Sequence, residues 1–132
     1  MIAVDTSALI AICLYEAERE RFIDVMDRAE RIFVSAATLV ETRIVAHNKG
    51  GAALVEKLDT LLETFDVEIV PPDLEQGDIA HAAFVQYGKG GGHRAQLNFG
   101  DLFSYALAKS RGVPLLYKGD DFVHTDIAAV VS

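Results

Sequence analysis

The chain has 132 residues, of which 51% are hydrophobic, and it carries a formal net charge of −8. A chain of this length and apolar content forms one domain and can bury a core without disulfides or structural metal. The negative charge argues against a simple nucleic-acid binder, which normally presents a basic face. We therefore expect a single domain over residues 1–132, whose acidic residues either cover the surface or bind a cation.

The sequence also indicates a reducing compartment. Cys13 is the only cysteine, and because it lies in an apolar run we expect it in the core. The first residues, 1–4, lack the basic start of a secretory signal, and every apolar run is too short to span a bilayer. A chain with these features is expected in the cytoplasm, without membrane contact.

Apolar periodicity and capping residues predict alternating strands and helices. Short continuous apolar runs that end at polar residues predict strands, whereas apolar residues at 3.6-residue spacing predict helices. Glycine and proline pairs mark the breaks between them. In chain order, we expect a strand at 1–4, a helix at 8–15, an amphipathic segment in 16–30, a strand at 31–34, helices at 36–48 and 54–65, a strand at 67–70, helices at 73–87 and 98–112, and strands at 113–117 and 127–131.

This alternation indicates an α/β domain with a buried sheet. Each predicted strand is short and continuously apolar, as in parallel sheets that helices cover on both faces. We expect about five strands in a mostly parallel central sheet. Ligands bind such sheets beyond the carboxyl ends of the strands, where the strand order reverses. Polar residues that directly follow a strand are therefore candidates for a functional site.

Several acidic residues follow predicted strands. Asp5 comes directly after the first strand, where it serves either a site or a helix cap, with Thr6 and Ser7 as further candidates for the cap. Asp120 and Asp121 follow the fourth strand, in a segment that is otherwise an ordinary polar turn. Both positions belong to the carboxyl edge of the predicted sheet.

Two further acids lie on predicted helices. Glu41 shares a helical stripe with Ala37, Ile44 and Val45, so we expect it to be partly buried and to need a partner, either an arginine or a cation. Asp101 lies in the first turn of its helix, where the helix N-terminus alone can stabilise an acid. Taken singly, each of these positions is a weak signal.

Taken together, the acids predict a divalent-metal site. Carboxylates gathered at one sheet edge repel one another and raise one another's pKa values. A hard cation such as Mg²⁺ or Mn²⁺ takes oxygen ligands and relieves this repulsion, whereas the sequence has no HxxxH or CxxC spacing typical of zinc. Carboxylate-bound Mg²⁺ activates water and stabilises charge on phosphate, which suits phosphodiester hydrolysis.

The same motifs, in this order, resemble the PIN domain, and specifically the VapC-type toxins of bacterial type II toxin–antitoxin pairs. The resemblance spans nearly the whole chain and does not depend on one motif. It implies a PIN-like three-layer α/β/α domain and a Mg²⁺-dependent endoribonuclease, with Mn²⁺ as a substitute. The segments that carry it are 2–9 (IAVDTSAL), the helix around Glu41, 97–101 (LNFGD), 115–122 (LLYKGDDF) and 125–127 (TDI).

The resemblance also implies roles for the acids. The first three match the core acids of the family by position, and the fourth is either of two adjacent aspartates. The expected catalytic residues are Asp5, Glu41, Asp101, Asp120 and Asp121, and the expected metal ligands are Asp5, Glu41, Asp101 and Asp121.

Residues around the acids are assigned less directly. The hydroxyls of Ser7 and Ser104 are expected to support the acids, unless they are a cap and a helix-face residue. Basic residues on the glycine-rich loop suit phosphate contacts, with a mobile surface loop as the alternative. An arginine two residues after Glu41 either reaches the phosphate or pairs with an acid. The residues expected to contact RNA are Arg43, Lys89, His93 and Arg94.

The resemblance implies partners as well. We expect the chain to cleave single-stranded or looped RNA, to form a homodimer and to be inhibited by a cognate VapB-like antitoxin. The net charge of −8 suits an antitoxin segment that is basic. The apolar faces of residues 8–15 and 22–26 either hold such a partner or pack in the core.

Three other classes of protein were weighed against this interpretation. A receiver domain needs a phosphoacceptor aspartate after its middle strand, where this chain has a proline pair. A haloacid-dehalogenase-type phosphatase needs an aspartate two residues after its nucleophile, where this chain has Ser7. A catalytically silent PIN-like binding module shares the fold, but the intact Asp5, Glu41 and Asp101 argue against it.

Overall fold

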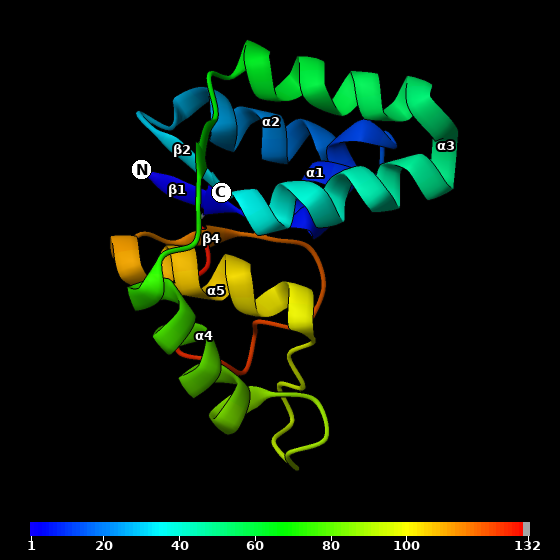
Figure 1. The fold of residues 1–132 in the computed structure, drawn as a ribbon. Coiled ribbons are helices and arrows are strands. Elements are labelled where there is room, and N and C mark those ends of the chain that lie inside the picture. The colour runs from blue at the N-terminus through cyan, green and yellow to red at the C-terminus, as the bar shows by residue number, and fades with distance from the viewer. Residues whose placement is uncertain (131–132) are drawn as a thin grey trace.

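The structure is a computed structural model, and it describes residues 1–130. Strands and helices alternate along the chain as the sequence predicts (Figure 1). The strands are β1 (Ile2–Val4), β2 (Ile32–Ser35), β3 (Glu68–Val70) and β4 (Leu115–Leu116). The helices are α1 (Thr6–Cys13), α2 (Arg19–Arg28), α3 (Ala36–Thr64), α4 (Leu74–Tyr87) and α5 (Phe99–Arg111).

The four strands form a parallel sheet in the order β3-β2-β1-β4. Ala3 of β1 pairs with Phe33 on one side and with Leu115 on the other. The chain first builds the sheet from β1 toward β3 and then returns to place β4 on the opposite side of β1. The strand order therefore reverses between β1 and β4, which is where α/β sheets bind ligands.

The expected strand count of about five is corrected to four. The predicted strand at 127–131 forms one parallel bridge, between Ala129 and Leu115, and its last residue lies outside the described residues. Leu115 donates its N–H to the Ala128 carbonyl and accepts from the Val130 N–H, at 2.8 and 3.1 Å. This segment therefore lies beside β4 without adding a fifth strand to the sheet.

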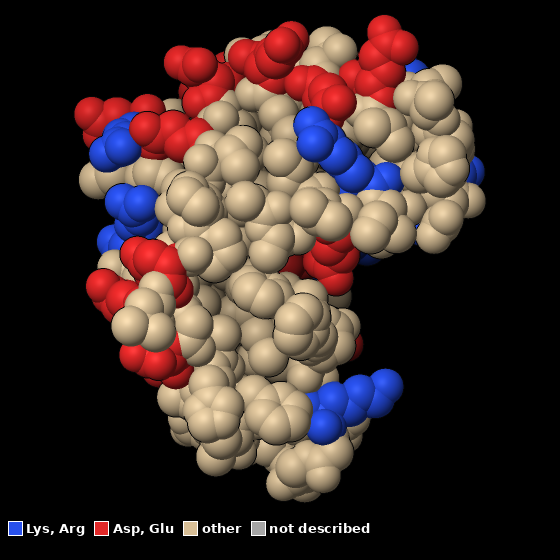
Figure 2. All heavy atoms as spheres, viewed as in Figure 1, with Lys and Arg blue, Asp and Glu red and all other residues tan. Residues whose placement is uncertain are grey.

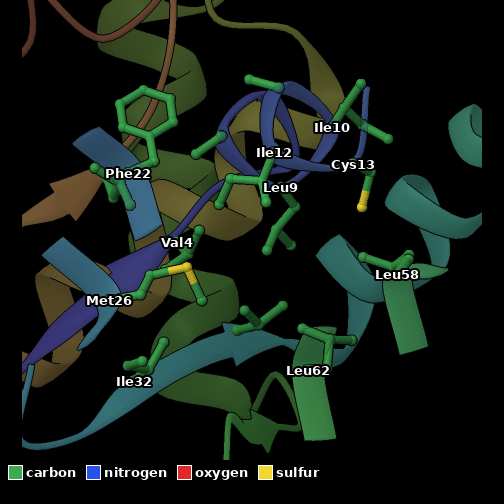
Figure 3. Close-up of a cluster of buried hydrophobic side chains, with 14 of the residues drawn as sticks. Val4, Leu9, Ile10, Ile12, Cys13, Phe22, Met26, Ile32, Leu58 and Leu62 are labelled. Carbon is green, nitrogen blue, oxygen red and sulfur yellow. The ribbon is translucent and has the colours of Figure 1, made fainter. Parts of the chain in front are cut away.

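Helices cover both faces of the sheet, which gives three layers (Figure 1). Side chains alternate along each strand, so that Val4 and Val34 point toward α1, α2 and α3, whereas Ala3 and Phe33 point toward α4 and α5. Figure 3 shows the first of these two cores, with apolar side chains from β1, α1, α2 and α3 directed inward. Cys13 belongs to this core, as expected. The predicted α/β/α arrangement is confirmed.

The long helix α3 consists of two arms. Gly51 has φ +67° and ψ −162°, a backbone conformation that is essentially restricted to glycine, and it interrupts the helical path. The second arm folds back beside the first (Figure 1) and contributes Leu54 and Leu58 to the core with α1. The two helices predicted at 36–48 and 54–65 are these arms.

Helix caps fix where α1 and α5 begin at the sheet edge. Asp5, rather than Thr6 or Ser7, caps α1, because its extended backbone lets the carboxylate accept from the Ser7 N–H at 3.1 Å. Asn98, where the sequence predicts that helix to begin, caps α5. Within residues 1–130, no helix is both long and apolar enough to cross a membrane.

Candidate active site

Acidic side chains from four separated segments meet beyond the carboxyl ends of β1 and β4. Asp5 follows β1, Glu41 lies in the first arm of α3, Asp101 lies in the first turn of α5, and Asp121 follows β4. Burial is the main cause of the raised pKa values of Glu41 and Asp101, the charge of Asp5 adds to both, and the charge of Asp121 adds to the rise at Asp101. Asp5 is therefore in electrostatic contact with Glu41 and Asp101, and Asp121 with Asp101.

Asp5 is buried and held by two serines. Its Oδ2 accepts from Ser7 N at 3.1 Å and from Ser7 Oγ at 2.8 Å, and its Oδ1 accepts from Ser104 Oγ at 2.5 Å. Ser7 Oγ in turn accepts from the backbone N–H of Lys118, at 2.9 Å, which ties the end of β4 to the start of α1. Ser7 and Ser104 thus fix the Asp5 carboxylate by hydrogen bonds.

Asp101 is buried at the start of α5 and takes part in a capping box. Its Oδ2 accepts from Asn98 N at 3.0 Å, and Asn98 Oδ1 accepts from Asp101 N at 2.9 Å. Burial raises the pKa of Asp101 to about 8, against the opposing effect of the bond from Asn98, and the charges of Asp5 and Asp121 add to the rise. Asp101 is therefore both a helix cap and a carboxylate with unfavourable surroundings for its charge.

Glu41 is half-buried between α1 and α5. Thr6 Oγ1 donates a hydrogen bond to Glu41 Oε1 at 2.6 Å. Burial raises the pKa of Glu41, the Thr6 hydrogen bond opposes that rise, and the charge of Asp5 adds to it. On the other side, a Cβ at Gly100 would lie 1.8 Å from Glu41 Oε2, so a larger residue there would force this carboxylate to move. The sequence allowed either an arginine or a cation as the partner of Glu41. No salt bridge among the described residues joins Glu41 to an arginine.

The two candidates for the fourth acid have different surroundings. Asp121 lies close enough to Asp101 to raise its pKa by charge and by side-chain contact. The charge of Asp120 instead adds to the effect of burial in raising the pKa of Tyr117. Asp121 is thus the one of these two aspartates that interacts with Asp101.

Two of the four basic residues expected to contact RNA have partners within the chain. Arg43 donates from Nε and Nη2 to Asp59 Oδ1, both at 3.1 Å, on the exposed side of the α3 hairpin. This is the acid pairing that the sequence left open. His93 accepts from the Ala95 N–H through Nδ1, at 3.0 Å, and packs edge-on against Tyr87.

The other two basic residues, Lys89 and Arg94, are exposed on the loop between α4 and α5. Backbone hydrogen bonds from Lys89 N to Leu97 O and from Leu97 N to Tyr87 O close the base of this loop. Figure 2 shows a hollow between the α3 hairpin and the region of this loop, with acidic atoms on its inner wall and basic side chains projecting below it. The hollow therefore lies between the acids and this loop.

An apolar groove of about 660 Å³ adjoins Glu41. Its lining includes Val40, Ile44 and Phe99, whose side chains are exposed, together with Phe103. Phe99 packs edge-on against Phe103 and keeps 76% of its surface exposed. The acid cluster is therefore bordered by uncovered apolar surface.

Sequence reasoning missed three threonines beside the acids. Thr6 Oγ1 lies 2.8 Å from Thr42 Oγ1, and Thr42 Oγ1 donates to the Thr38 carbonyl at 2.7 Å. The available signals were weak: Thr6 follows Asp5, Thr42 follows Glu41, and Thr38 lies one helical turn before Thr42. Only the packing of α1 on α3 turns these positions into a network.

The chemistry of this donor set fits a hard divalent cation. All four acids offer carboxylate oxygens, and none of them takes part in a salt bridge between described residues. Within residues 1–130, no three metal-binding side chains are gathered into a ready-made cage. Mg²⁺ does not require one, because it keeps several waters and commonly binds one or two carboxylates together with substrate phosphates.

Comparisons with known proteins agree with this geometry. The PIN domain profile matches residues 2–128. Ribonuclease VapC30 of Mycobacterium tuberculosis is 44% identical over 129 residues, which cover 98% of each chain. The solved structure of M. tuberculosis VapC20, titled a sarcin-ricin loop cleaving toxin, has a TM-score of 0.79 at 18% identity and covers 98% of each chain. A toxin–antitoxin complex from Klebsiella pneumoniae has a TM-score of 0.75 at 16% identity, covering 98% of this chain and 97% of that one.

Proposed function

The chain belongs to the PIN-domain family, in its VapC-type group, and from this premise we propose that it is a metal-dependent endoribonuclease, the toxin of a type II toxin–antitoxin pair. Relatives named VapC ribonucleases share 38–44% identity with more than nine tenths of the chain, which supports a nuclease that acts on RNA. One structural observation carries the proposal. Asp5, Glu41, Asp101 and Asp121 converge at the switch point of the sheet with no cation among their described partners.

Asp5, Glu41, Asp101 and Asp121 would hold Mg²⁺, for which Mn²⁺ would substitute. When bound, the cation activates water and stabilises the charge that develops on the phosphate and the leaving oxygen. The chain itself supplies fixed oxygens: serine hydroxyls hold Asp5, and the Asn98 N–H holds Asp101. Burial disfavours the free charges and so favours a bound cation.

We propose that the substrate is single-stranded or looped RNA lying in the hollow beside the acids. Lys89 and Arg94 are exposed on the adjoining loop and are free to meet phosphates, and His93 would join them if it left Tyr87. Arg43 would reach RNA only by leaving Asp59, but an exposed ion pair of this kind is worth only about 0–1 kcal/mol.

We also propose that the chain acts in the cytoplasm under the control of a VapB-like antitoxin. The solved structures with the same fold include toxin–antitoxin complexes, which supports an antitoxin partner. Because this chain is acidic, the inhibiting segment is expected to be basic and to place a cation among the acids. The exposed Val40, Ile44 and Phe99 support the homodimer expected for this family, because self-association would cover them.

The direct test is an assay of the purified chain on RNA. We expect cleavage of a single-stranded or hairpin-loop RNA in Mg²⁺ or Mn²⁺, no cleavage in EDTA, and full recovery when metal is returned. A fully double-stranded RNA of the same sequence should resist. Activity that survives EDTA, or equal cleavage of the duplex, would contradict the proposed metal dependence or the proposed substrate class, respectively.

A further inference from the structure

We propose that Thr6 is a positioning residue for this reaction, which holds the Glu41 carboxylate in place for the acid cluster; the proposal rests on the proposed function. Thr6 is the first residue of α1 and directly follows Asp5, whereas Glu41 lies on α3, 35 residues along the chain. The 2.6 Å hydrogen bond from Thr6 Oγ1 to Glu41 Oε1 therefore joins two elements that each carry an acid of the site.

The direction of this hydrogen bond follows from its two atoms. A hydroxyl has a proton to donate and a carboxylate oxygen accepts, so Thr6 donates its proton to Glu41. Thr6 Oγ1 also lies 2.8 Å from Thr42 Oγ1, and the fully buried Thr42 donates its own proton to the Thr38 carbonyl at 2.7 Å. Thr6 Oγ1 therefore lies between the Glu41 carboxylate and a buried hydroxyl of α3.

Gly100 confines the same carboxylate from the opposite side. A Cβ at this position would overlap Glu41 Oε2, at 1.8 Å, so this oxygen keeps its present place against the first turn of α5 because residue 100 is glycine, and a larger residue would shift it. One carboxylate oxygen of Glu41 is thus held by a donor on α1, and the other lies against the backbone of α5.

Glu41 needs this support because no other hydrogen bond or ion pair among the described residues holds its carboxylate. No described salt bridge involves Glu41, and the negative charge of nearby Asp5 pushes the two carboxylates apart. A glutamate side chain also has several rotatable bonds, so an unrestrained carboxylate would leave the site for solvent. Partners that orient metal-binding carboxylates typically change metal affinity or activity by about 10- to 100-fold when removed.

Three variants of the full chain test the proposal. Thr6→Val keeps the branched shape but removes the donor, and Thr6→Ser keeps the donor. Thr64→Val is the matched control, because Thr64 bonds only the carbonyl of Thr60 at the far end of α3. The readouts are the single-turnover rate on RNA at saturating Mn²⁺, KM for RNA, and Mn²⁺ affinity by calorimetry.

We expect Thr6→Val to lower the rate and weaken Mn²⁺ binding, each by about 10- to 100-fold, with KM for RNA nearly unchanged. Thr6→Ser should recover most of both losses, and Thr64→Val should match the wild type.

A Thr6→Val protein with wild-type rate and wild-type Mn²⁺ affinity would overturn the proposal. A Thr6→Ser protein that recovers neither the rate nor the Mn²⁺ affinity would overturn it as well. A wild-type chain that binds Mn²⁺ but cuts no RNA would defeat the proposed function instead, and the Mn²⁺ affinities of the variants would still decide the role of Thr6.

Discussion

At the scale of single residues, Asp101 is held by opposing interactions. The capping box favours its charged form, whereas burial and the neighbouring charges of Asp5 and Asp121 favour the protonated form and raise its pKa to about 8. From the sequence, Asp101 is either an acid that the helix N-terminus stabilises or a member of the acid site. Its position in the first turn of the helix does not show whether its side chain is buried. In the structure the Asp101 carboxylate takes part in the capping box and is also buried beside other acids. The pH dependence of stability measures which of the two effects on its pKa is stronger.

The first prediction concerns the pH dependence of stability without metal. An unfolded aspartate titrates near pH 4, and folded Asp101 titrates near pH 8. Between these values the folded state binds the extra proton, so its contribution to stability is present at low pH and is lost as the pH rises toward 8. We expect the melting temperature of the wild type in EDTA to fall more steeply from pH 5 to pH 8 than that of Asp101→Asn.

The control for this comparison is Asp24→Asn, which changes an exposed aspartate that pairs with Arg28 on α2. Its melting temperatures should follow those of the wild type across the same pH range. Parallel curves for the wild type and Asp101→Asn would show that the pKa of Asp101 is not raised.

The second prediction concerns the space beside Glu41. Gly100→Ala should lower the cleavage rate by about 10- to 100-fold, because the new methyl group displaces Glu41 Oε2. The fold should survive, since alanine is favoured over glycine in a helix by about 1 kcal/mol. Gly77→Ala is the matched control on α4, where an added Cβ meets open space. Wild-type activity in Gly100→Ala, measured beside Gly77→Ala, would mean that Glu41 does not need its present position.

At the scale of secondary-structure elements, local signals predicted most boundaries, and tertiary pairing decided the rest. The glycine pair at 50–51 indicated the break in α3 correctly. The break needs a backbone conformation that essentially only glycine adopts, so a glycine in the sequence points to it. The strand expected at 127–131 depended on its partner, and in the structure this segment meets β4 through a single bridge between Ala129 and Leu115. The contact between Thr6 and Glu41 was likewise invisible, because it exists only after α1 packs on α3.

The third prediction tests the break in α3. Gly51→Ala should destabilise the fold by about 1–3 kcal/mol, because φ +67° with ψ −162° is strained for any residue with a Cβ. An added Cβ at Gly51 meets no atom within 4 Å, so the cost comes from the backbone alone. Urea denaturation would measure it, with Gly77→Ala expected to be neutral or slightly stabilising. Equal stability of Gly51→Ala and the wild type would mean that the two arms do not require this conformation.

At the scale of the whole molecule, the chain carries a net charge of −8, and the apolar groove beside Glu41 is open. The sequence predicted the layers of the fold and which segments carry the acids, because both follow from apolar runs and from the ends of strands. It could not show that Arg43 pairs with Asp59, nor that Asp121 rather than Asp120 faces Asp101. Those choices depend on side-chain directions that only the assembled fold determines.

The fourth prediction concerns self-association through the groove. We expect the purified chain to be a dimer in light scattering, and Phe99→Glu to shift it toward monomer, because a charge would replace an apolar side chain that is 76% exposed. Leu74→Glu is the matched control, since Leu74 is 81% exposed on α4 and lies outside the groove lining. A monomeric wild type, or a Phe99→Glu protein as dimeric as Leu74→Glu, would contradict this interface.

The claim that the acids at the sheet edge carry out RNA cleavage is tested most directly by Asp101→Asn. This change keeps the size of the side chain and its ability to accept from Asn98 N, and removes the charge that would hold a cation. The measurement is cleavage of single-stranded RNA in Mn²⁺, with Asp24→Asn as control and circular dichroism as the check on folding. We predict an unchanged spectrum and loss of cleavage in Asp101→Asn, with full activity in Asp24→Asn. Cleavage by Asp101→Asn at the wild-type rate would contradict the assignment of this site.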